Sequence, residues 1–507
     1  MHKLARLDHA FVWHPFTQMR DWLKREPIVI VDGKGAVLRD VKGREYLDGH
    51  SSIWTNLHGH HQPKINAAIQ RQLKQIAHSS ALGLANKPAS LLAARLIGEA
   101  NRNCDLRFKI YGPKGKSVRE SEIVNRKLEK VFFSDDGSTA MEVALKLAYE
   151  FARRTGRSKK PKFLSLDGAY HGDSVGAVSL GHIGLFHKAY AGLLFKSDTV
   201  MSPYCYRCPY NRAKPERGDA RAYRQCNWEC VDKVERKFAA RQKRGDPYAA
   251  LAVEPLIQGA AGMIPQPSGW LKRVTEIARG YGAQLIVDEV MTGFGRVGQA
   301  SRLPIGPTHS GRDRRDACPT LFACHHEGVQ PDFLCLAKGM TGGYLPMAAT
   351  LTTQAVFDAF LGEYEEFKTF FHGHSYTANQ LGAAASLANL DLLSSPASVR
   401  ARARLEEVLQ DELRGLWSLP NVGDVRQVGL VVGVELVRNW RTRERFDVRE
   451  RAGIRVCETM ARRGVLTRPV GNVVVLMPPY CTTLIQARKM VRTLAESVSE
   501  AFGTGRL

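Results

Sequence analysis

A lysine and an aspartate each follow an apolar run that is typical of a buried strand. Lys338 follows the run FLCLA, and Asp288 closes the run AQLIVD fifty positions earlier. A lysine amine can form a Schiff base with an aldehyde, and a carboxylate can keep a ring nitrogen protonated. Pyridoxal phosphate needs both groups from its protein, so the pair suggests a site for that cofactor. Either residue alone is more often a structural lysine or an acidic strand end.

The segments around this pair indicate a parallel sheet that is covered by helices. The run LIVDEV is apolar on both faces and follows a helical stretch, WLKRVTEIARGYG, that ends on glycine. Helical and apolar segments alternate from about residue 60 to 394, which predicts an α/β fold with a mostly parallel sheet. An acidic residue at the carboxyl end of such a strand lies where open α/β sheets bind ligands.

A strand-to-helix junction offers a place for a phosphate group. Gly137 and Ser138 stand between the apolar run KVFFSD and the helical pattern STAMEVALKLAYEFARR. The first turn of a helix has free backbone N–H groups and a favourable dipole for anions. The alternative is an ordinary helix cap, because serine and glycine are common at that position.

Eight motifs, taken together, resemble the class III branch of the pyridoxal-phosphate aminotransferases. In chain order they are WHPFTQM, YLDGHSSIWTNLHGH, FFSDDGSTAMEVALKLA, GAYHGDSVGAVSLG, LIVDEVMTGFGRVG, CLAKGMTGGYLPMAATL, FFHGHSYTANQLG and TRPVGNVVVLMPPY. The resemblance implies fold type I, the fold of aspartate aminotransferase, and a homodimer with shared active sites. The chain is most similar to the branch that serves biotin synthesis, which implies transamination of 8-amino-7-oxononanoate to 7,8-diaminononanoate. Another ω-amino-acid transaminase, such as one for 4-aminobutyrate, is the enzymatic alternative, which the first and last motifs disfavour.

The resemblance also assigns expected roles to single residues. Tyr170 should stack on the cofactor ring, which Lys338 and Asp288 hold, and Ser375 with His374 should reach the phosphate from the neighbouring subunit. The planar guanidinium of Arg468 should bind the substrate carboxylate. A core tyrosine and a surface ion pair are the alternatives for Tyr170 and Arg468. The substrate-site residues implied in this way are Phe16, Ile53, Trp54, Tyr170, Gly373 and Arg468.

The amino donor stays open at this point. The common donor in this branch is S-adenosylmethionine, which is the prediction for this chain. Many members have a tyrosine where this chain has Phe16, a second tryptophan where it has Ile53, and an aromatic hydroxyl near Val475. Their absence resembles a branch in which lysine is the donor, so lysine is the alternative.

The family pattern predicts an N-terminal arm over residues 1–59, a large cofactor-binding domain over 60–394 and a small domain over 395–507. The arm, with its DGKG and VKGRE turns, should contribute to the small domain. Insertions near 101–127, 205–230 and 299–320 are rich in Gly, Pro and Arg, which predicts loops outside the core.

The second insertion holds four cysteines, Cys205, Cys208, Cys226 and Cys230, in a CxxC followed by a CxxxC. Four thiolates with such spacing can surround zinc tetrahedrally, so a structural metal is one hypothesis and four unligated thiols are the other. Ten cysteines in 507 residues are too few for a secreted disulfide scaffold. The N-terminus lacks the apolar core of a secretory signal and no stretch approaches about 20 apolar residues, which predicts a cytoplasmic protein.

The chain carries a net charge of +23, from 73 Lys and Arg against 50 Asp and Glu. Such an excess raises the hypothesis of a non-catalytic protein that binds nucleic acid. The basic residues are scattered and no nucleic-acid module is recognisable, which favours a solvated basic surface and small-molecule substrates. We expect neither nucleic acid nor membrane as a partner.

Overall fold

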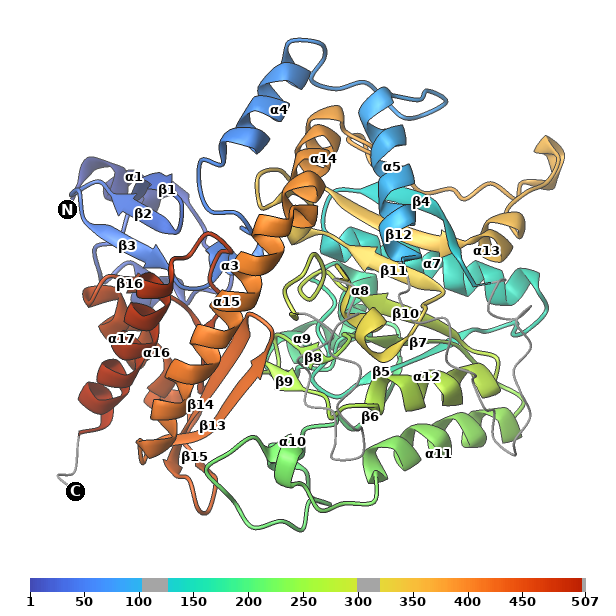
Figure 1. The fold of residues 1–507 in the computed structure, drawn as a ribbon. Coiled ribbons are helices and arrows are strands. Elements are labelled where there is room, and N and C mark those ends of the chain that lie inside the picture. Colours follow the sequence, from blue (N-terminus) through green and yellow to red (C-terminus); the bar gives the residue numbers. More distant parts are fainter. Residues whose placement is uncertain (103–125, 299–319, 504–507) are drawn as a thin grey trace.

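The computed structural model describes residues 1–102, 126–298 and 320–503 and divides them between a large and a small lobe (Figure 1). The insertions predicted near 101–127 and 299–320 therefore lie almost wholly outside the described residues. Within the described ranges, no helix combines the length and the apolar character that crossing a bilayer requires.

A seven-stranded sheet lies at the centre of the large lobe, in the order β4-β12-β11-β10-β7-β5-β6. Its strands are β4 (Leu128–Ser134), β5 (Lys162–Leu166), β6 (Asp198–Val200), β7 (Tyr248–Val253), β10 (Gln284–Asp288), β11 (Phe333–Leu336) and β12 (Ala348–Thr353). Only β12 runs antiparallel to its neighbours, and the other pairs are parallel. The predicted α/β class with a mostly parallel sheet is confirmed.

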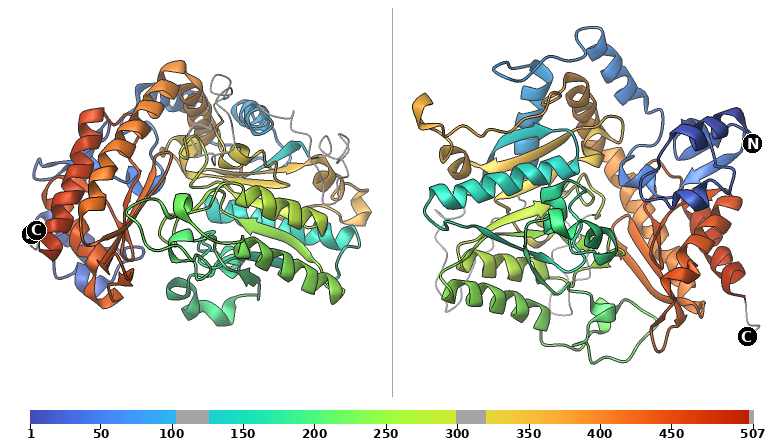
Figure 2. Two further views of the ribbon diagram at one scale, coloured as in Figure 1. Left: turned by 60° about the horizontal axis from the view of Figure 1, so that its bottom comes forward. Right: turned by 180° about the vertical axis from the view of Figure 1, so that it is seen from behind.

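Two hydrophobic clusters cover the two faces of this sheet, because successive strand residues point to opposite sides. In β10, Leu285 and Val287 belong to one cluster and Ile286 to the other. Helix α12 (Trp270–Gly280) packs on the first face and α7 (Gly137–Arg154) on the second. Figure 1 shows α12 in front of the sheet, and the rear view in Figure 2 shows α7 in front.

Helix α7 starts where the sequence predicted, directly after β4. The side chain of Asp136 accepts the N–H of Thr139, and Thr139 returns a contact to the N-cap backbone, which forms a capping box. Its buried face is lined by small residues such as Ala140, Ala144 and Ala148. These short side chains bring the first turn of the helix close to the sheet.

The small lobe joins both ends of the chain. Strands β1 (Ile30–Lys34), β2 (Val37–Asp40) and β3 (Glu45–Asp48) form an antiparallel meander, and β16 (Val465–Leu466) adds to β3 in parallel. A second sheet has the order β13-β14-β18-β17, with β15 beside β14. Its strands are β13 (Val422–Val428), β14 (Val431–Asn439), β15 (Glu444–Arg445), β17 (Pro469–Val470) and β18 (Val473–Leu476).

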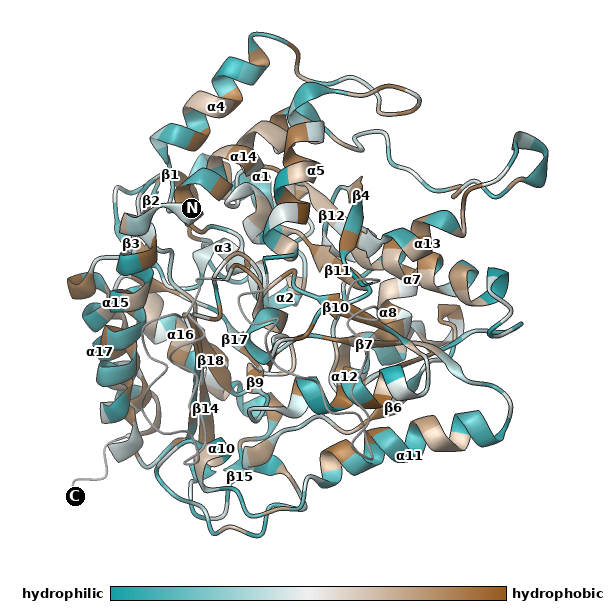
Figure 3. Cartoon of the chain, turned by 45° about the vertical axis from the view of Figure 1, so that its right-hand side comes forward, coloured by the Kyte–Doolittle hydropathy of each residue, from teal (hydrophilic) through white to brown (hydrophobic). Residues whose placement is uncertain are grey.

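Helices pack around both lobes, and Figure 3 shows apolar central strands beside helices with hydrophilic outer turns, such as α11. The other α-helices are α1 (Lys3–Phe11), α2 (Met19–Trp22), α3 (Ser51–Trp54), α4 (Pro63–Leu73), α5 (Lys87–Ala100), α8 (Val175–Leu180), α9 (Gly184–His187), α10 (Ala220–Tyr223), α11 (Glu229–Lys243), α13 (Gln354–Asp358), α14 (Gln380–Ser394), α15 (Pro396–Leu413), α16 (Ala452–Arg462) and α17 (Leu484–Phe502). A short hairpin, β8 (Ile257–Gln258) with β9 (Ile264–Pro265), follows β7.

The second insertion, residues 205–230, is largely irregular but is not a free loop. It contains a short 3₁₀ segment, η2 (Cys205–Arg207), and helix α10. Cys205, Tyr206 and Ala220 form a small buried cluster of their own. These three side chains lie apart from the main core, but Cys230, the last residue of the segment, is buried in that core. The expectation that the segment lies outside the core is therefore wrong at Cys230, because this residue belongs to helix α11, which packs on the core.

Candidate active site at the carboxyl edge of the sheet

The sheet brings Lys338 and Asp288 to the same edge. Asp288 is the last residue of β10 and pairs with Cys335 of β11, the strand that ends two residues before Lys338. Neighbouring parallel strands end at the same side, so both side chains emerge at the carboxyl edge. The carboxylate of Asp288 attracts the charged form of the lysine amine and so tends to raise the pKa of Lys338.

Lys338 is held in a strained and enclosed place. Its φ is +44°, at the start of the 3₁₀ segment η5 (Lys338–Thr341). Burial lowers the pKa of its amine, and the carboxylates of Asp288 and Glu254 oppose that shift. The Nζ atom lies 4.8 Å from the ring centroid of Trp54. An amine with a lowered pKa is more often neutral, which is the form that attacks a carbonyl.

Asp288 is paired with His171, a histidine to which the sequence patterns assigned no role. Its Oδ2 lies 2.8 Å from Nδ1 of His171, and its Oδ1 accepts the N–H of Val290 at 3.0 Å. His171 is buried, which disfavours its charged form, but the hydrogen bond to Asp288 prevails and raises its pKa. The raised pKa favours the protonated imidazole, which places a positive charge against the carboxylate of Asp288.

The first turn of α7 forms a cradle beside this pair. The Oγ of Ser138 lies 2.6 Å from the Oγ of Ser174 and accepts the N–H of that residue at 2.9 Å. The hydroxyl of Ser174 donates in turn to Glu142 at 2.6 Å. A Cβ at Gly172, whose φ is +117°, would fall 2.4 Å from the Cβ of Ser138. A helix N-terminus, a positioned hydroxyl and this glycine together fit a phosphate group.

Tyr170 and Glu254 close the site on another side. The hydroxyl of Tyr170 donates to Asp173 at 2.7 Å, and its backbone N–H donates to Glu254 at 3.4 Å. Glu254 also accepts the N–H of Gly259 at 2.8 Å, and burial raises its pKa to about 7. The sequence carried a signal for Glu254, because it follows the apolar strand AALAV just as Asp288 follows its own strand.

An aromatic row leads from Tyr170 to Arg468. The ring of Tyr170 lies 6.4 Å from that of Phe186, which lies 5.2 Å from the ring of Phe16. The guanidinium of Arg468 donates to the backbone carbonyl of Phe16 at 2.8 Å and is otherwise exposed. A cation at the end of an apolar row suits a substrate with an alkyl chain and a terminal carboxylate.

Trp54 lies beside the lysine in an unusual backbone segment that also holds Ile53. All four residues of α3, from Ser51 to Trp54, have positive φ values between 48° and 68°. Such strain persists only where the surroundings enforce it, and it is concentrated at functional sites. Trp54 faces Lys338, whereas Ile53 is partly exposed.

The loop that holds Gly373, His374 and Ser375 lies near the cradle within one chain. The Nδ1 of His374 is 3.3 Å from the Oδ2 of Asp135, which stands just before α7. The carbonyl of Ser375 accepts from His78 at 2.9 Å. The expected contact of Ser375 across a subunit boundary stays a prediction.

The predicted structural metal is not supported. Cys205, Cys208, Cys226 and Cys230 do line one cavity of about 10 Å³. In the described part of the chain, however, no three His, Cys, Asp or Glu side chains are placed to hold a metal ion. Burial raises the pKa of Cys205 and of Cys230 to about 12, as expected for buried thiols. The spacing brought the four residues together but did not arrange them as ligands.

Comparison with known proteins identifies relatives over nearly the whole length. A family model for class III aminotransferases matches residues 19–301 and 317–498. The adenosylmethionine-8-amino-7-oxononanoate aminotransferase of Geobacter sulfurreducens is 43% identical over 496 residues, which cover 98% of this chain and 97% of the relative. A crystal structure of the enzyme of that name from Methanocaldococcus jannaschii has a TM-score of 0.81, 35% identity and 98% coverage of both chains. An amine transaminase from an uncultivated Pseudomonas species, solved in its PLP-bound form, has a TM-score of 0.80 at 31% identity, with 97% and 98% coverage.

Proposed function

Because the chain belongs to the class III aminotransferases, we propose that it uses pyridoxal phosphate to convert 8-amino-7-oxononanoate to 7,8-diaminononanoate in biotin synthesis. Binding of the cofactor is supported above all by one observation: Lys338 and the Asp288–His171 pair lie at the same edge of the sheet. The substrate is supported by relatives named adenosylmethionine-8-amino-7-oxononanoate aminotransferase at 36–43% identity, over 98–99% of this chain and 81–97% of each relative. Membership of an enzyme family also leaves the alternative of a non-catalytic nucleic-acid-binding protein without support.

The residues at this edge match the parts of the cofactor one by one. Lys338 would hold its aldehyde carbon, Asp288 its ring nitrogen, and Gly137 with Ser138 its phosphate. Tyr170 would cover the ring. When bound, the cofactor supplies an electron-accepting ring that stabilises negative charge on the substrate carbon.

The chain's own groups then move protons and hold charge. Lys338, with its lowered pKa, would take the proton from the amine-bearing carbon of the substrate and deliver it to the cofactor carbon that had carried the aldehyde. His171 pairs with Asp288 and fixes the orientation of that carboxylate, which would hold the ring nitrogen in its protonated form. Trp54 and Tyr170 exclude water from the site.

The far end of the site would bind the carboxylate of the keto substrate. Arg468 offers a planar pair of N–H donors for the carboxylate. The rings of Phe16 and Phe186 pack along the apolar chain between that carboxylate and the reacting carbon. The spacing between Arg468 and Lys338 therefore selects the length of the substrate.

S-adenosylmethionine is the donor that we propose, in line with the names of the relatives. Lysine stays the alternative because Phe16, Ile53 and Val475 lack the polar groups that many relatives present to the adenosyl donor. Val475 is 1% exposed in the middle of β18, so that no side chain reaches a donor from this position.

A homodimer with shared active sites and a cytoplasmic location complete the proposal. Several large apolar side chains are exposed on the α4–α5 linker and on the segment around η6 (Tyr364–Glu366), which extends from the large lobe in Figure 1. They are Leu82, Leu84, Tyr364, Phe367, Phe371 and Tyr376. A second copy would cover them and bring its own Ser375 to the cradle. Light scattering should give a mass near 113 kDa, about twice the 56.4 kDa of one chain.

Half-reaction spectroscopy of the purified holoenzyme tests the proposal. The absorption band of the lysine-bound cofactor should bleach with S-adenosylmethionine and recover when 8-amino-7-oxononanoate is added, and mass spectrometry should detect 7,8-diaminononanoate. Bleaching by lysine alone would change the donor and leave the substrate intact. Bleaching by 4-aminobutyrate, with no effect of either other donor, would overturn the assignment.

A further inference from the structure

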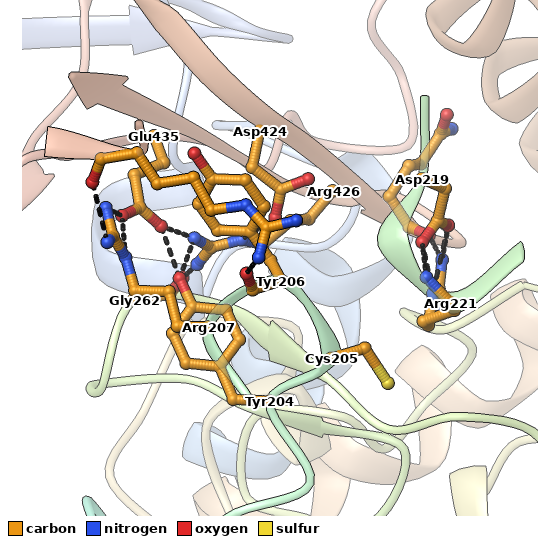
Figure 4. Close-up of polar contacts among 12 residues, drawn as sticks. Tyr204, Cys205, Tyr206, Arg207, Asp219, Arg221, Gly262, Asp424, Arg426 and Glu435 are labelled. Carbon is orange, nitrogen blue, oxygen red and sulfur yellow. Dashed lines mark hydrogen bonds and ion pairs between the residues drawn. The ribbon is translucent and has the colours of Figure 1, made fainter. Parts of the chain in front are cut away.

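A buried cluster of charged and aromatic residues ties the second insertion to the small lobe (Figure 4). Tyr204 and Arg207 come from the segment between β6 and α11, Asp424 and Arg426 from β13, and Glu435 from β14. Asp424, Arg426 and Glu435 are between 1% and 4% exposed. Two guanidinium groups and two carboxylates thus meet in one place, and each is paired within the cluster.

Arg426 is the centre of the cluster. Its Nε donates to Asp424 at 2.7 Å, and one terminal nitrogen contacts both Glu435 and the hydroxyl of Tyr204. The guanidinium also lies 4.7 Å from the ring centroid of Tyr204. Its other terminal nitrogen donates to the backbone carbonyl of Gly262, which belongs to the large lobe.

The insertion adds a second set of contacts to Glu435. Arg207 donates from Nε to Glu435 at 2.6 Å and from a terminal nitrogen to the carbonyl of Arg443 at 2.9 Å. The hydroxyl of Tyr204 donates to the same carboxylate. Burial raises the pKa of Tyr204 to about 12, so this hydroxyl keeps its proton at any physiological pH.

On the large-lobe side, the cluster reaches the active site through the loop that follows β7. This loop carries Glu254, Gly259 and Gly262, and Glu254 accepts the N–H of Gly259. A Cβ at Gly259 would lie 3.4 Å from the ring of Trp54, so the loop packs directly on that ring. The Trp54 ring in turn faces Lys338.

On the small-lobe side, the cluster reaches Arg468 through three paired strands. Glu435 in β14 pairs with Val473 in β18, which pairs with β17, and Arg468 immediately precedes β17. The two lobes are in tight contact here, because a Cβ at Gly433 would lie 2.7 Å from the Cβ of Met263. A shift of Arg426 relative to Gly262 would therefore move the strand that leads to Arg468.

We propose that the cluster of Tyr204, Arg207, Asp424, Arg426 and Glu435 is a positioning device that holds Arg468 at a fixed distance from Lys338. It thereby sets the affinity for the carboxylate end of the substrate and does not touch the reacting atoms. This inference rests on the proposed function, in which Arg468 binds a carboxylate. It assigns a role in substrate selection to the insertion at residues 205–230 and to Tyr204, the residue that precedes it.

Tyr204→Phe is the sharpest variant, since it removes one hydroxyl and leaves the charges of Arg426 and Glu435 paired. Tyr206→Phe is the matched control, because the hydroxyl of Tyr206 is also buried on this segment but has no hydrogen-bond partner among the described residues. Steady-state kinetics would use 8-amino-7-oxononanoate and its methyl ester, which cannot bind Arg468 as an anion.

For Tyr204→Phe we expect KM for the acid to rise about tenfold. The kcat for both compounds and KM for the ester should change less than about twofold. Tyr206→Phe should leave all four constants within about twofold of the wild type. In an Arg468→Ala background, Tyr204→Phe should have no further effect on KM, because the group that it positions is gone.

The proposal is overturned if Tyr204→Phe raises KM for acid and ester equally, or if its effect adds fully to that of Arg468→Ala. A fall in kcat with an altered cofactor absorption band would also overturn it, since that result indicates general damage to the site. If the wild type prefers another keto acid, the same acid-to-ester comparison is made on that compound. Failure of the proposed substrate and failure of the cluster's role are then separate results.

Discussion

Gly172 is the position at which one added methyl group would test the geometry of the phosphate cradle. Its φ of +117° lies in a region that L-residues rarely adopt, and a Cβ would fall 2.4 Å from the Cβ of Ser138 and 2.5 Å from its Oγ. In Gly172→Ala, either the backbone of the turn or the Ser138 side chain must move. Ser138 is held by Ser174, so its displacement would also disturb that hydrogen bond.

Two costs combine in this variant. Backbone strain at such a φ costs about 1–3 kcal/mol, and overpacking by one methyl group costs about 1–3 kcal/mol more. We therefore expect a loss of about 2–6 kcal/mol, shared between the stability of the fold and the binding of the cofactor. If about half of that loss falls on the cradle, the affinity for pyridoxal phosphate drops between about fivefold and about 140-fold, at about 1.4 kcal/mol per factor of ten.

The assay is titration of the cofactor-free protein with pyridoxal phosphate, together with thermal unfolding with and without the cofactor. Gly43→Ala is a control for backbone strain alone, since Gly43 has a φ of +78° and, apart from its chain neighbours, no atom of the described residues lies within 4 Å of its Cβ position. Gly98→Ala, at an open position in α5, should be neutral or stabilising by about 0.5–1 kcal/mol. An unchanged cofactor affinity in Gly172→Ala would refute the assignment of Ser138 and Gly172 to the phosphate site.

Three further predictions concern the charged groups of the site. Asp288→Asn should keep the shape of the pair with His171 but slow the donor half-reaction at least about a hundredfold, with a smaller loss of cofactor affinity. Stopped-flow absorbance measures the rate of the half-reaction separately from the affinity for the cofactor. Lys338→Ala should yield no protein–cofactor adduct after borohydride treatment, as read by mass spectrometry, and retention of the adduct would refute the assignment of this lysine. Glu254→Gln should flatten the pH dependence of stability, because burial raises the pKa of Glu254 from 4.5 to about 7. Because the pKa of Glu254 is raised, this residue stabilises the folded protein by about 3 kcal/mol below about pH 4.5, and that stabilisation is lost as the pH rises through about 7. The difference in Tm between pH 5 and pH 8 should therefore shrink in the variant.

The positions of Lys338 and Asp288 could be predicted from sequence because strand patterns decide them. A run that is apolar on both faces must lie inside a sheet, and parallel strands that follow helices end at one edge. The structure confirms the sheet and places both residues at that edge. The start of α7 at Gly137 followed from the same logic, since a strand and a helical pattern define the junction locally, although the N-cap is Asp136 and not the glycine or serine that the sequence suggested.

His171 and Ser174 were beyond the reach of sequence patterns. Their contacts depend on the turn after β5, which brings them against β10 and α7 from residues that are 32 to 117 positions distant. The hydrophobic periodicity of a sequence predicts local helices and strands, but it does not predict a contact between two distant residues. The cysteine motif shows the opposite limit, because its spacing brought four thiols to one cavity, yet within the described part of the chain no three of them are placed to hold a metal ion.

Substrate length is the property that depends most on tertiary packing. The two ends of the site, Lys338 and Arg468, lie on different lobes, and Phe16 comes to Arg468 from the other end of the chain. Each local element could form correctly while the lobes sat at a slightly different angle, and the carboxylate would then be out of reach. Because displacements of about 1 Å are enough to cost a hundredfold in rate, a buried and charge-balanced contact between the lobes has a direct kinetic consequence. The contacts of Arg426 with Gly262 and Glu435 have the right location for that task, since they join the loop beside Lys338 to the strands beside Arg468.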